Sequence, residues 1–151
     1  IMRTHWLSSC LVLLITTLAV AQKNTQGISG QVLWKAGNFM PTIGTKASVP
    51  KAVPVVREVY IYALTNDKQV EAGEDAGFYQ KVNSKLVRKV KTDKKGRFSV
   101  TLPVGYYSVF TKEEKGLYAN LFDDAMNINP VQVQKRRWTK MDVVVDYQAV
   151  Y

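Results

Sequence analysis

The strongest constraint on the fold is a succession of short segments in which apolar and polar residues alternate, each ended by a turn signal. Alternation with a period of two is typical of half-buried β-strands, because successive side chains point to opposite faces of a sheet. No long segment has the period of an amphipathic helix. The pattern predicts an all-β sandwich of about seven short strands. We expect strands near residues 27–34, 55–64, 85–92, 97–102, 106–110, 131–133 and 141–147.

Two of these strands allow more detailed predictions. Gly30 in the middle of the first strand indicates a bulge or a close approach of another backbone. Both faces of residues 55–64 are apolar, which favours a central position in a sheet. Arg57 and Glu58 at its start are expected to form a solvated pair. In the last strand, alternation places Asp142, Val144 and Asp146 on one face.

A tight turn ending at Gly96 separates residues 85–92 from residues 97–102. We expect these two segments to pair as a hairpin, because a short glycine-containing loop commonly joins antiparallel strands. In the first of them, Leu86 and Val90 suit the core face and Val87 the opposite face.

Loops are predicted where turn residues are dense. Residues 36–54 carry several glycines and prolines and are expected to form a long irregular connection. Residues 67–80 are acidic and contain glycine, which predicts a second irregular loop. Residues 117–122 are apolar and are expected to be a short helix or irregular.

The first 21 residues have the layout of a secretory signal peptide. Arg3 precedes an apolar run, and residues 19–21, Ala-Val-Ala, have the small residues that a signal peptidase accepts. The run is only about half of the roughly 20 residues that a membrane-spanning helix needs, which disfavours a retained span. Lipid attachment at Cys10 is disfavoured because the apolar run follows this residue. We expect residues 1–21 to be removed on export to the periplasm or cell exterior, leaving one domain at residues 22–151.

After residue 21 the chain contains neither histidine nor cysteine, since His5 and Cys10 are the only ones. It therefore offers no imidazole base, no thiolate nucleophile, no disulfide and no Cys/His zinc site. A Ser–Lys dyad finds no support, because Ser84 and Lys85 are adjacent in a predicted strand and point to opposite faces. We expect no catalytic residue, no metal and no cofactor.

The composition favours acidic partners. Twenty of the 21 basic residues and all 12 acidic ones follow residue 21, giving that part a formal net charge of +8. A basic surface attracts polyanions such as acidic glycans, anionic lipid head groups or nucleic acid. Nucleic acid is not expected as the partner of an exported protein.

The stretch from Thr92 to Val109 resembles the T-D-x-x-G-x-F-x-V-x-L-P-x-G-x-Y-x-V signature of carboxypeptidase regulatory-like domains. The residues that match this signature are Asp93, Gly96, Phe98, Pro103, Gly105 and Tyr107. In addition, residues 28–32 resemble the I-x-G-x-V first strand of the same family, in which Gly30 is the glycine. The resemblance covers the whole chain after residue 21. In its overall arrangement, the chain is similar to stand-alone exported versions of this domain in Bacteroidetes-type bacteria. One departure is Val104, where the family usually has a second proline.

The resemblance implies a transthyretin-like (prealbumin-like) Greek-key sandwich of about seven strands. In metallo-carboxypeptidases such a domain accompanies the catalytic domain and does no chemistry. Some transthyretin-like proteins hydrolyse a purine breakdown product, but they rely on histidines and a C-terminal Y-R-G-S, which this sequence does not have. The signature residues are expected to maintain the fold, and they say nothing of a ligand.

Two groups of residues are candidates for binding. The first is a basic surface on the predicted hairpin, a candidate site for polyanions, and its members are Lys85, Arg88, Lys89, Lys91, Lys94, Lys95 and Arg97. The alternative is that these residues are solvated and keep an edge strand from pairing with other chains. The second is the loop tip at Phe39 and Met40, because apolar loop residues need burial or a partner. The alternative there is that the loop folds back and caps the core.

A third cluster, Asp123, Asp124, Asn127 and Asn129, offers oxygen ligands for calcium but matches no EF-hand spacing, so an Asx-rich turn is favoured. The sequence as a whole predicts a non-catalytic exported accessory module of the cell envelope. We expect it to bind a protein partner through loops or an edge strand. The alternative is a module that binds acidic glycan or an anionic envelope surface through the basic hairpin.

Overall fold

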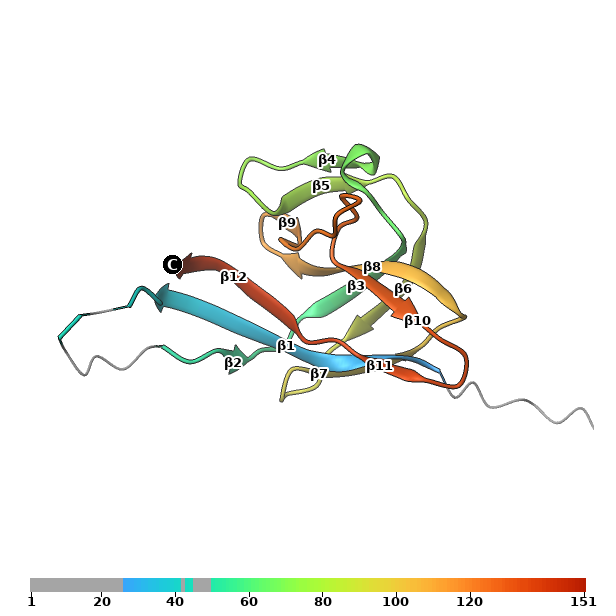
Figure 1. The fold of residues 1–151 in the computed structure, drawn as a ribbon, viewed down its shortest axis with the longest axis horizontal. Coiled ribbons are helices and arrows are strands. Elements are labelled where there is room, and N and C mark those ends of the chain that lie inside the picture. The colour runs from blue at the N-terminus through green and yellow to red at the C-terminus, as the bar shows by residue number, and fades with distance from the viewer. Residues whose placement is uncertain (1–25, 42, 45–49) are drawn as a thin grey trace, which may run out of the picture.

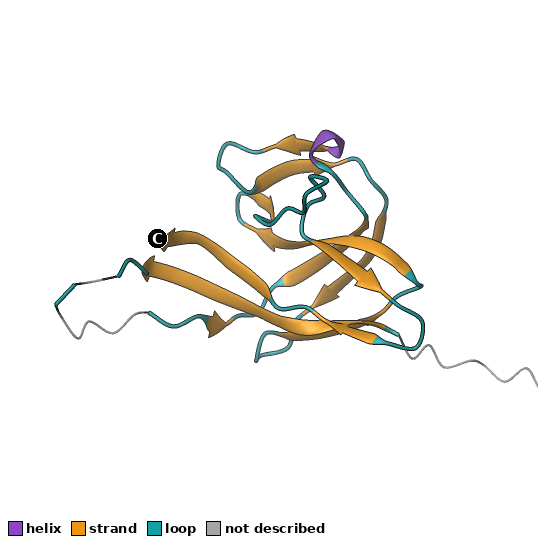
Figure 2. Cartoon of the chain, viewed as in Figure 1, coloured by secondary structure: helices purple, strands orange, loops and turns teal. Residues whose placement is uncertain are grey.

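The structure is a computed structural model that describes residues 26–41, 43–44 and 50–151. It is nearly all β, with two sheets in a sandwich-like arrangement, as the alternation predicts (Figures 1 and 2). The predicted signal peptide lies outside the described residues. The strands are β1 (Gly27–Asn38), β2 (Val53–Pro54), β3 (Glu58–Ala63), β4 (Val70–Ala72), β5 (Phe78–Val82), β6 (Leu86–Lys91), β7 (Arg97–Thr101), β8 (Gly105–Glu113), β9 (Gly116–Tyr118), β10 (Pro130–Val133), β11 (Trp138–Lys140) and β12 (Val143–Val150).

The first sheet is organised around β1, which is long enough to pair with different neighbours along its two halves. Its N-terminal half lies between β7, antiparallel, and β11, parallel. Its C-terminal half lies between β2, antiparallel, and β12, parallel. The ends of β1 and β12 extend away from the second sheet (Figure 1). We call this projection, residues 35–38 and 148–150, the arm.

The second sheet has the strand order β4-β5-β9-β8-β3-β6, and β10 also pairs with β8. The predicted central position of residues 55–64 is confirmed, because β3 lies between β8 and β6. Both faces of this sheet are covered. Val109 and Phe110 are neighbours on β8, so their side chains point to opposite faces, and both are fully buried.

The main core lies between the two sheets, where β1, β3, β7, β8 and β12 direct their apolar side chains inward. Burial of each large side chain there stabilises the fold by about 1.5–3 kcal/mol. A second cluster lies on the other face of the second sheet, where β5 and the segment after β9 cover Phe110. The fully buried residues of the main core are Ile28, Val32, Val59, Ile61, Leu102, Val109, Val133 and Val145.

The predicted hairpin between residues 85–92 and 97–102 is wrong, because the turn instead carries the chain from one sheet to the other. β6 pairs with β3 of the second sheet, whereas β7 pairs with β1 of the first. The turn itself is present: Gly96 N donates to Asp93 O at 2.9 Å. Packing decides that β6 and β7 join different sheets, because this arrangement lets Phe98 fill the core between the sheets.

β6 also departs from simple alternation. A register shift opposite Ile61 and Tyr62 places an extra residue in the strand, which reverses the side-chain pattern on one side of it. As a result Val87 packs against the main core, while Leu86 is 41% exposed. The predicted directions of Leu86 and Val87 are therefore wrong, and that of Val90 is confirmed.

Three predicted loop segments contain strands instead. Residues 67–80 hold a 3₁₀ turn (Asp67–Gln69), β4 and the start of β5. Of residues 117–122, only 117 and 118 belong to a strand, β9, and the predicted loop 36–54 contains β2. These strands are two to five residues long, too short for alternation to reveal a period. They form because neighbouring strands supply the hydrogen bonds that an isolated short strand lacks.

Candidate functional site

The residues that match the signature described above stabilise the fold. A side chain on Gly30 would place its Cβ 1.8 Å from Met141 O, so the predicted close backbone approach is confirmed. The Tyr107 hydroxyl donates to Pro103 O at 2.7 Å and closes the turn before β8. Asp93 Oδ1 accepts from the backbone N of Lys95 and of Arg97, at 2.8 and 2.9 Å. These contacts are all with the backbone of the protein itself.

An ion pair that the sequence did not reveal closes one end of the core. Arg57 Nε lies 2.9 Å from Glu113 Oε1, so the expected solvated pair with Glu58 is wrong. The hydroxyl of Tyr147, on the first sheet, also donates to Glu113, at 3.2 Å. The only sequence signal was the alternation of β8, which places Glu113 on the same face as Val109. Arg57 and Glu113 both belong to the second-sheet side, next to paired strands β3 and β8, and the Tyr147 bond to Glu113 links this side to the first sheet.

The basic surface is divided between two sheets, because its residues come from β6, the turn and β7. β6 is an edge strand, pairing with β3 alone among the described strands. Lys89 Nζ lies 4.9 Å from the centre of the Tyr60 ring, and Arg97 pairs with Asp93 at 3.0 Å. The other five basic residues make no ion pair within the described part of the chain. This placement fits the alternative that lysines protect an exposed edge.

The two loop-tip residues have different roles. Phe39 is half-buried: its N–H donates to Val150 O at 2.7 Å, and its ring lies 5.8 Å from that of Tyr151. Lys35 Nζ lies 5.2 Å from the Phe39 ring centre. Met40 is 47% exposed and Ile43 is 99% exposed. Phe39 therefore anchors the loop to the arm without joining either apolar cluster, and the next apolar residues face solvent.

The proposed calcium cluster is a turn. Asp123 accepts from the N–H groups of Ala125 and Asn127 and from the Asn127 side chain, at 3.0, 2.8 and 2.8 Å. The bonds from Asn127, and then that from Ala125, hold the pKa of Asp123 below its ordinary value. Asn129 is buried and donates to Val109 O, so it faces away from such a site.

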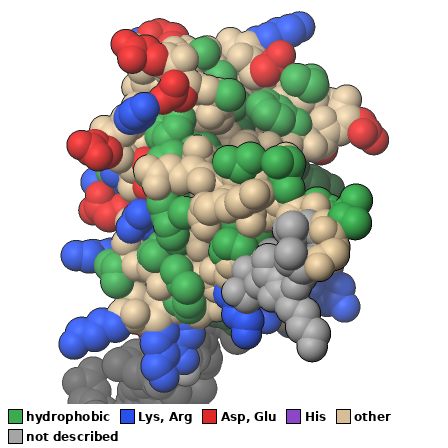
Figure 3. Space-filling model, turned by 90° about the vertical axis from the view of Figure 1, so that its left-hand side faces the viewer, with side chains coloured by type: hydrophobic (Ala, Val, Ile, Leu, Met, Phe, Trp, Pro, Cys, Tyr) green, Lys and Arg blue, Asp and Glu red, His purple; other side chains and the backbone are tan. Residues whose placement is uncertain are grey.

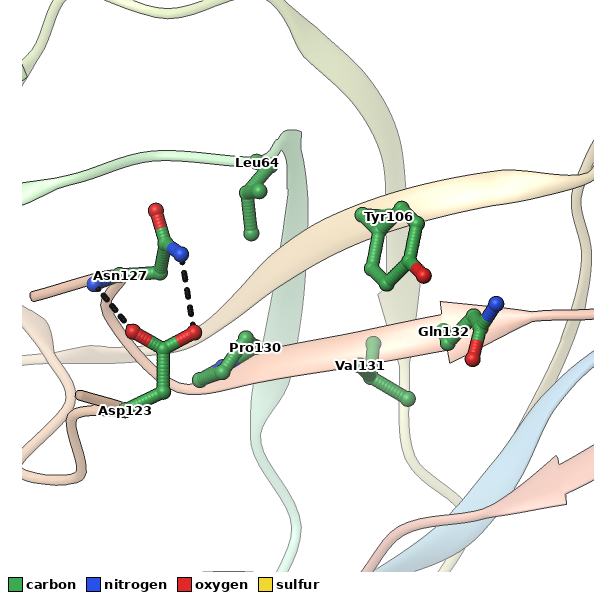
Figure 4. A pocket seen from close by; sticks show the side chains of 7 residues that line it. All are labelled: Leu64, Tyr106, Asp123, Asn127, Pro130, Val131 and Gln132. Atoms are coloured by element: carbon green, nitrogen blue, oxygen red, sulfur yellow. Dashed lines mark hydrogen bonds between the residues drawn. The ribbon is translucent and has the colours of Figure 1, made fainter. Parts of the chain in front are cut away.

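Beside this turn lies a shallow depression of about 360 Å³ (Figure 4). Tyr106 and Pro130 contribute apolar surface, and the Asp123–Asn127 bonds close one end. The remaining lining residues are Leu64, Val131 and Gln132. The figure shows no charged side chain free to bind a ligand, because the carboxylate is engaged within the turn.

A groove of about 490 Å³ at the C-terminal end of β12 combines aromatic rings with polar groups. Asp146 Oδ1 accepts from the Tyr118 hydroxyl at 2.8 Å and from Asn120 Nδ2 at 2.6 Å, and Oδ2 accepts from the Tyr151 hydroxyl. Burial, and then the bond to Asp146, raise the pKa of Tyr118 well above its ordinary value. The other lining residues are Ala76, Gly77, Phe122, Tyr147 and Ala149.

A bulge directs Asp146 into this groove. Trp34 pairs with Val145 and Ala36 with Gln148, so two residues of β12 stand opposite Lys35 alone. Regular alternation would place Asp146 beside Val144 on the outer face, as the sequence predicts. Instead it bonds to Tyr118, which belongs to the main core. Bulges commonly re-aim a side chain next to a functional site.

Among the described residues, no group of three or more His, Cys, Asp or Glu side chains is arranged to hold a metal ion. Within the same residues, no helix has the length and apolar character needed to cross a membrane.

Comparison with known proteins gives no family. A scan against family models finds no match, and searches of curated proteins and of solved structures find none.

Proposed function

We propose that this protein is a non-catalytic exported module of the cell envelope that binds a protein partner through Met40 and Ile43, which follow β1 and which we call the apolar end of the arm. The observation that carries the proposal is the exposure of Met40 and Ile43 beyond the anchored ring of Phe39. Neighbouring exposed apolar side chains are typical of protein contact surfaces. The signature-like stretch supports an accessory role, since the domains that it resembles do no chemistry.

The surroundings of this loop strengthen the proposal. Val150 in the arm and Val53 of β2, which pairs with Trp34 next to the arm, are also exposed. Figure 3 shows hydrophobic side chains spread over this end of the molecule, with acidic groups mainly in its upper part and basic groups mainly in its lower part. A partner bound here would bury apolar surface flanked by charges of both signs, which is the usual anatomy of a protein interface.

The second candidate function is binding of an acidic glycan or an anionic envelope surface by β6 and the turn after it. The observation that favours it is that Lys85, Arg88, Lys91, Lys94 and Lys95 are exposed and make no ion pair with the described residues. Binding of this kind is electrostatic and weakens steeply with salt.

A pull-down from cell-envelope extract, washed at low and at high salt, separates the two. One protein retained at high salt supports an apolar protein contact at the arm. Broad retention that disappears at high salt supports the basic surface. If nothing is retained in either wash, both candidate functions are wrong.

A further inference from the structure

We propose that the groove at the end of β12 binds pyranose units of a neutral oligosaccharide. The groove adjoins the arm, because Ala149 and Tyr151 line it and Tyr151 packs against Phe39. It does not include Met40 or Ile43, the exposed residues on which the proposed function rests. The groove is formed where β12 meets the turn before β5 and the segment that follows β9.

The polar centre of the groove is built in advance. Asp146 is held by the hydroxyl of Tyr118, which is buried in the core, and by the side-chain amide of Asn120. A carboxylate fixed in this way need not reorganise when a ligand arrives, which lowers the cost of binding. The bulge in β12 is what brings it to the groove.

Acceptors for sugar hydroxyls remain at this centre. Asn120 Oδ1 accepts no hydrogen bond from the described residues, since only Nδ2 of that amide is engaged. Within the described part of the chain, Asp146 Oδ2 accepts only from Tyr151, an exposed residue whose hydroxyl can exchange with one from a ligand. An ionised carboxylate has about four lone-pair sites, so it can accept a further donor.

Aromatic rings supply the second half of a sugar site. Phe122 is 46% exposed and Tyr151 is 65% exposed, and both line the groove. A pyranose ring presents an apolar C–H face that stacks on an aromatic ring, while its hydroxyl groups lie at the edge. Rings beside fixed acceptors match both features.

The charge of the groove selects a neutral ligand. Asp146 lies at its centre, and a sugar carboxylate or sulfate placed there would meet a like charge with no cation among the lining residues. Lys35 approaches the Tyr151 ring at 5.7 Å but is occupied over that ring and over Phe39.

The test is an NMR titration of the ¹⁵N-labelled protein with neutral hexasaccharides of gluco-, xylo-, manno- and galactopyranose. We expect at least one to shift the amide signals of Asn120, Phe122 and Ala149. Phe122→Ala should weaken that binding by about tenfold or more, because stacking is lost. Tyr106→Ala removes a similarly exposed ring from the depression of Figure 4 and should leave the affinity unchanged.

The assignment is overturned if none of the four sugars shifts these signals, or if Phe122→Ala binds as well as wild type. It is also overturned if a hexagalacturonate, which carries carboxylates, shifts them equally. Asn120→Ala provides a second variant on an exposed side chain. Replacing Met40 and Ile43 by serine should abolish partner retention and leave sugar binding intact, so the two proposals can fail separately.

Discussion

At the scale of single residues, the molecule depends on positions where only glycine fits or where one carboxylate organises a turn. Gly30 and Gly96 both lie against backbone, at Met141 O and Val32 O. Gly96 also has φ +69°, a conformation that other residues rarely adopt. The sequence could indicate that these glycines matter, but not which backbone approaches them, because the neighbours are distant along the chain.

Gly30→Ala should destabilise the protein strongly. Its Cβ would lie 1.8 Å from Met141 O, so β1 and the segment before β12 would have to separate. We expect a loss of about 3 kcal/mol or more, beyond ordinary overpacking. Chemical denaturation measures the free energy of unfolding. Gly105→Ala is the control, since its nearest contact would be an ordinary 3.5 Å, and equal losses for both variants would contradict the predicted close approach.

Asp93 should titrate below its ordinary pKa of 3.8, mainly because its carboxylate accepts the Arg97 backbone N–H. A pKa lowered by folding means that the group stabilises the fold above the unfolded value and loses this effect as pH falls through the folded value. The loss therefore belongs below pH 3.8. Following the Asp93 carboxyl carbon by NMR should give a midpoint under 3.8, and a midpoint at or above it would show that these hydrogen bonds are absent.

At the scale of elements, alternation identified the longer strands and failed where the ladder is irregular. β3, β7 and β8 lie where alternation predicts them, because each directs apolar residues at period two into the main core. The side-chain directions in β6 and β12 were mispredicted because each contains a register shift, which no residue type marks. The turn at Asp93–Gly96 was predicted correctly, but the sheet that each flanking strand joins is decided by tertiary packing.

The bulge in β6 can be tested by a pair of substitutions. Val87→Ser should cost about 1–2 kcal/mol, because this side chain packs against the main core. Leu86→Ser should change stability by less than about 0.5 kcal/mol, because Leu86 is exposed. Regular alternation instead predicts that Leu86→Ser destabilises the protein more than Val87→Ser does. Denaturation midpoints with Leu86→Ser as the more damaging change would rule the bulge out.

At the scale of the whole molecule, the two sheets are joined by the core and, at one end of it, by the contacts of Glu113 with Arg57 and Tyr147. Glu113→Gln should destabilise the protein by about 1–3 kcal/mol, because it leaves the Arg57 guanidinium without its anionic partner. Glu71→Gln breaks the exposed pair with Lys81 and should cost less than about 0.5 kcal/mol. Thermal unfolding compares the two, and similar melting temperatures would mean that the Arg57 pair contributes no more than a surface contact.

The candidate sites differ in how far the sequence could predict them. Apolar residues in a glycine- and proline-rich loop pointed to Phe39 and Met40, of which Met40 is exposed and Phe39 is half-buried. The groove at β12 could not be predicted, because its residues come from separate segments near positions 76, 120 and 150. Only the register shift turns Asp146 toward them.

The central claim is that the apolar end of the arm binds a protein. The most direct measurement is retention of an envelope protein at high salt by wild type and by the Met40→Ser, Ile43→Ser double variant, with Leu86→Ser as an exposed apolar control on another strand. We predict one partner held by wild type and by the control, and lost in the double variant. Equal retention by all three proteins would contradict the claim.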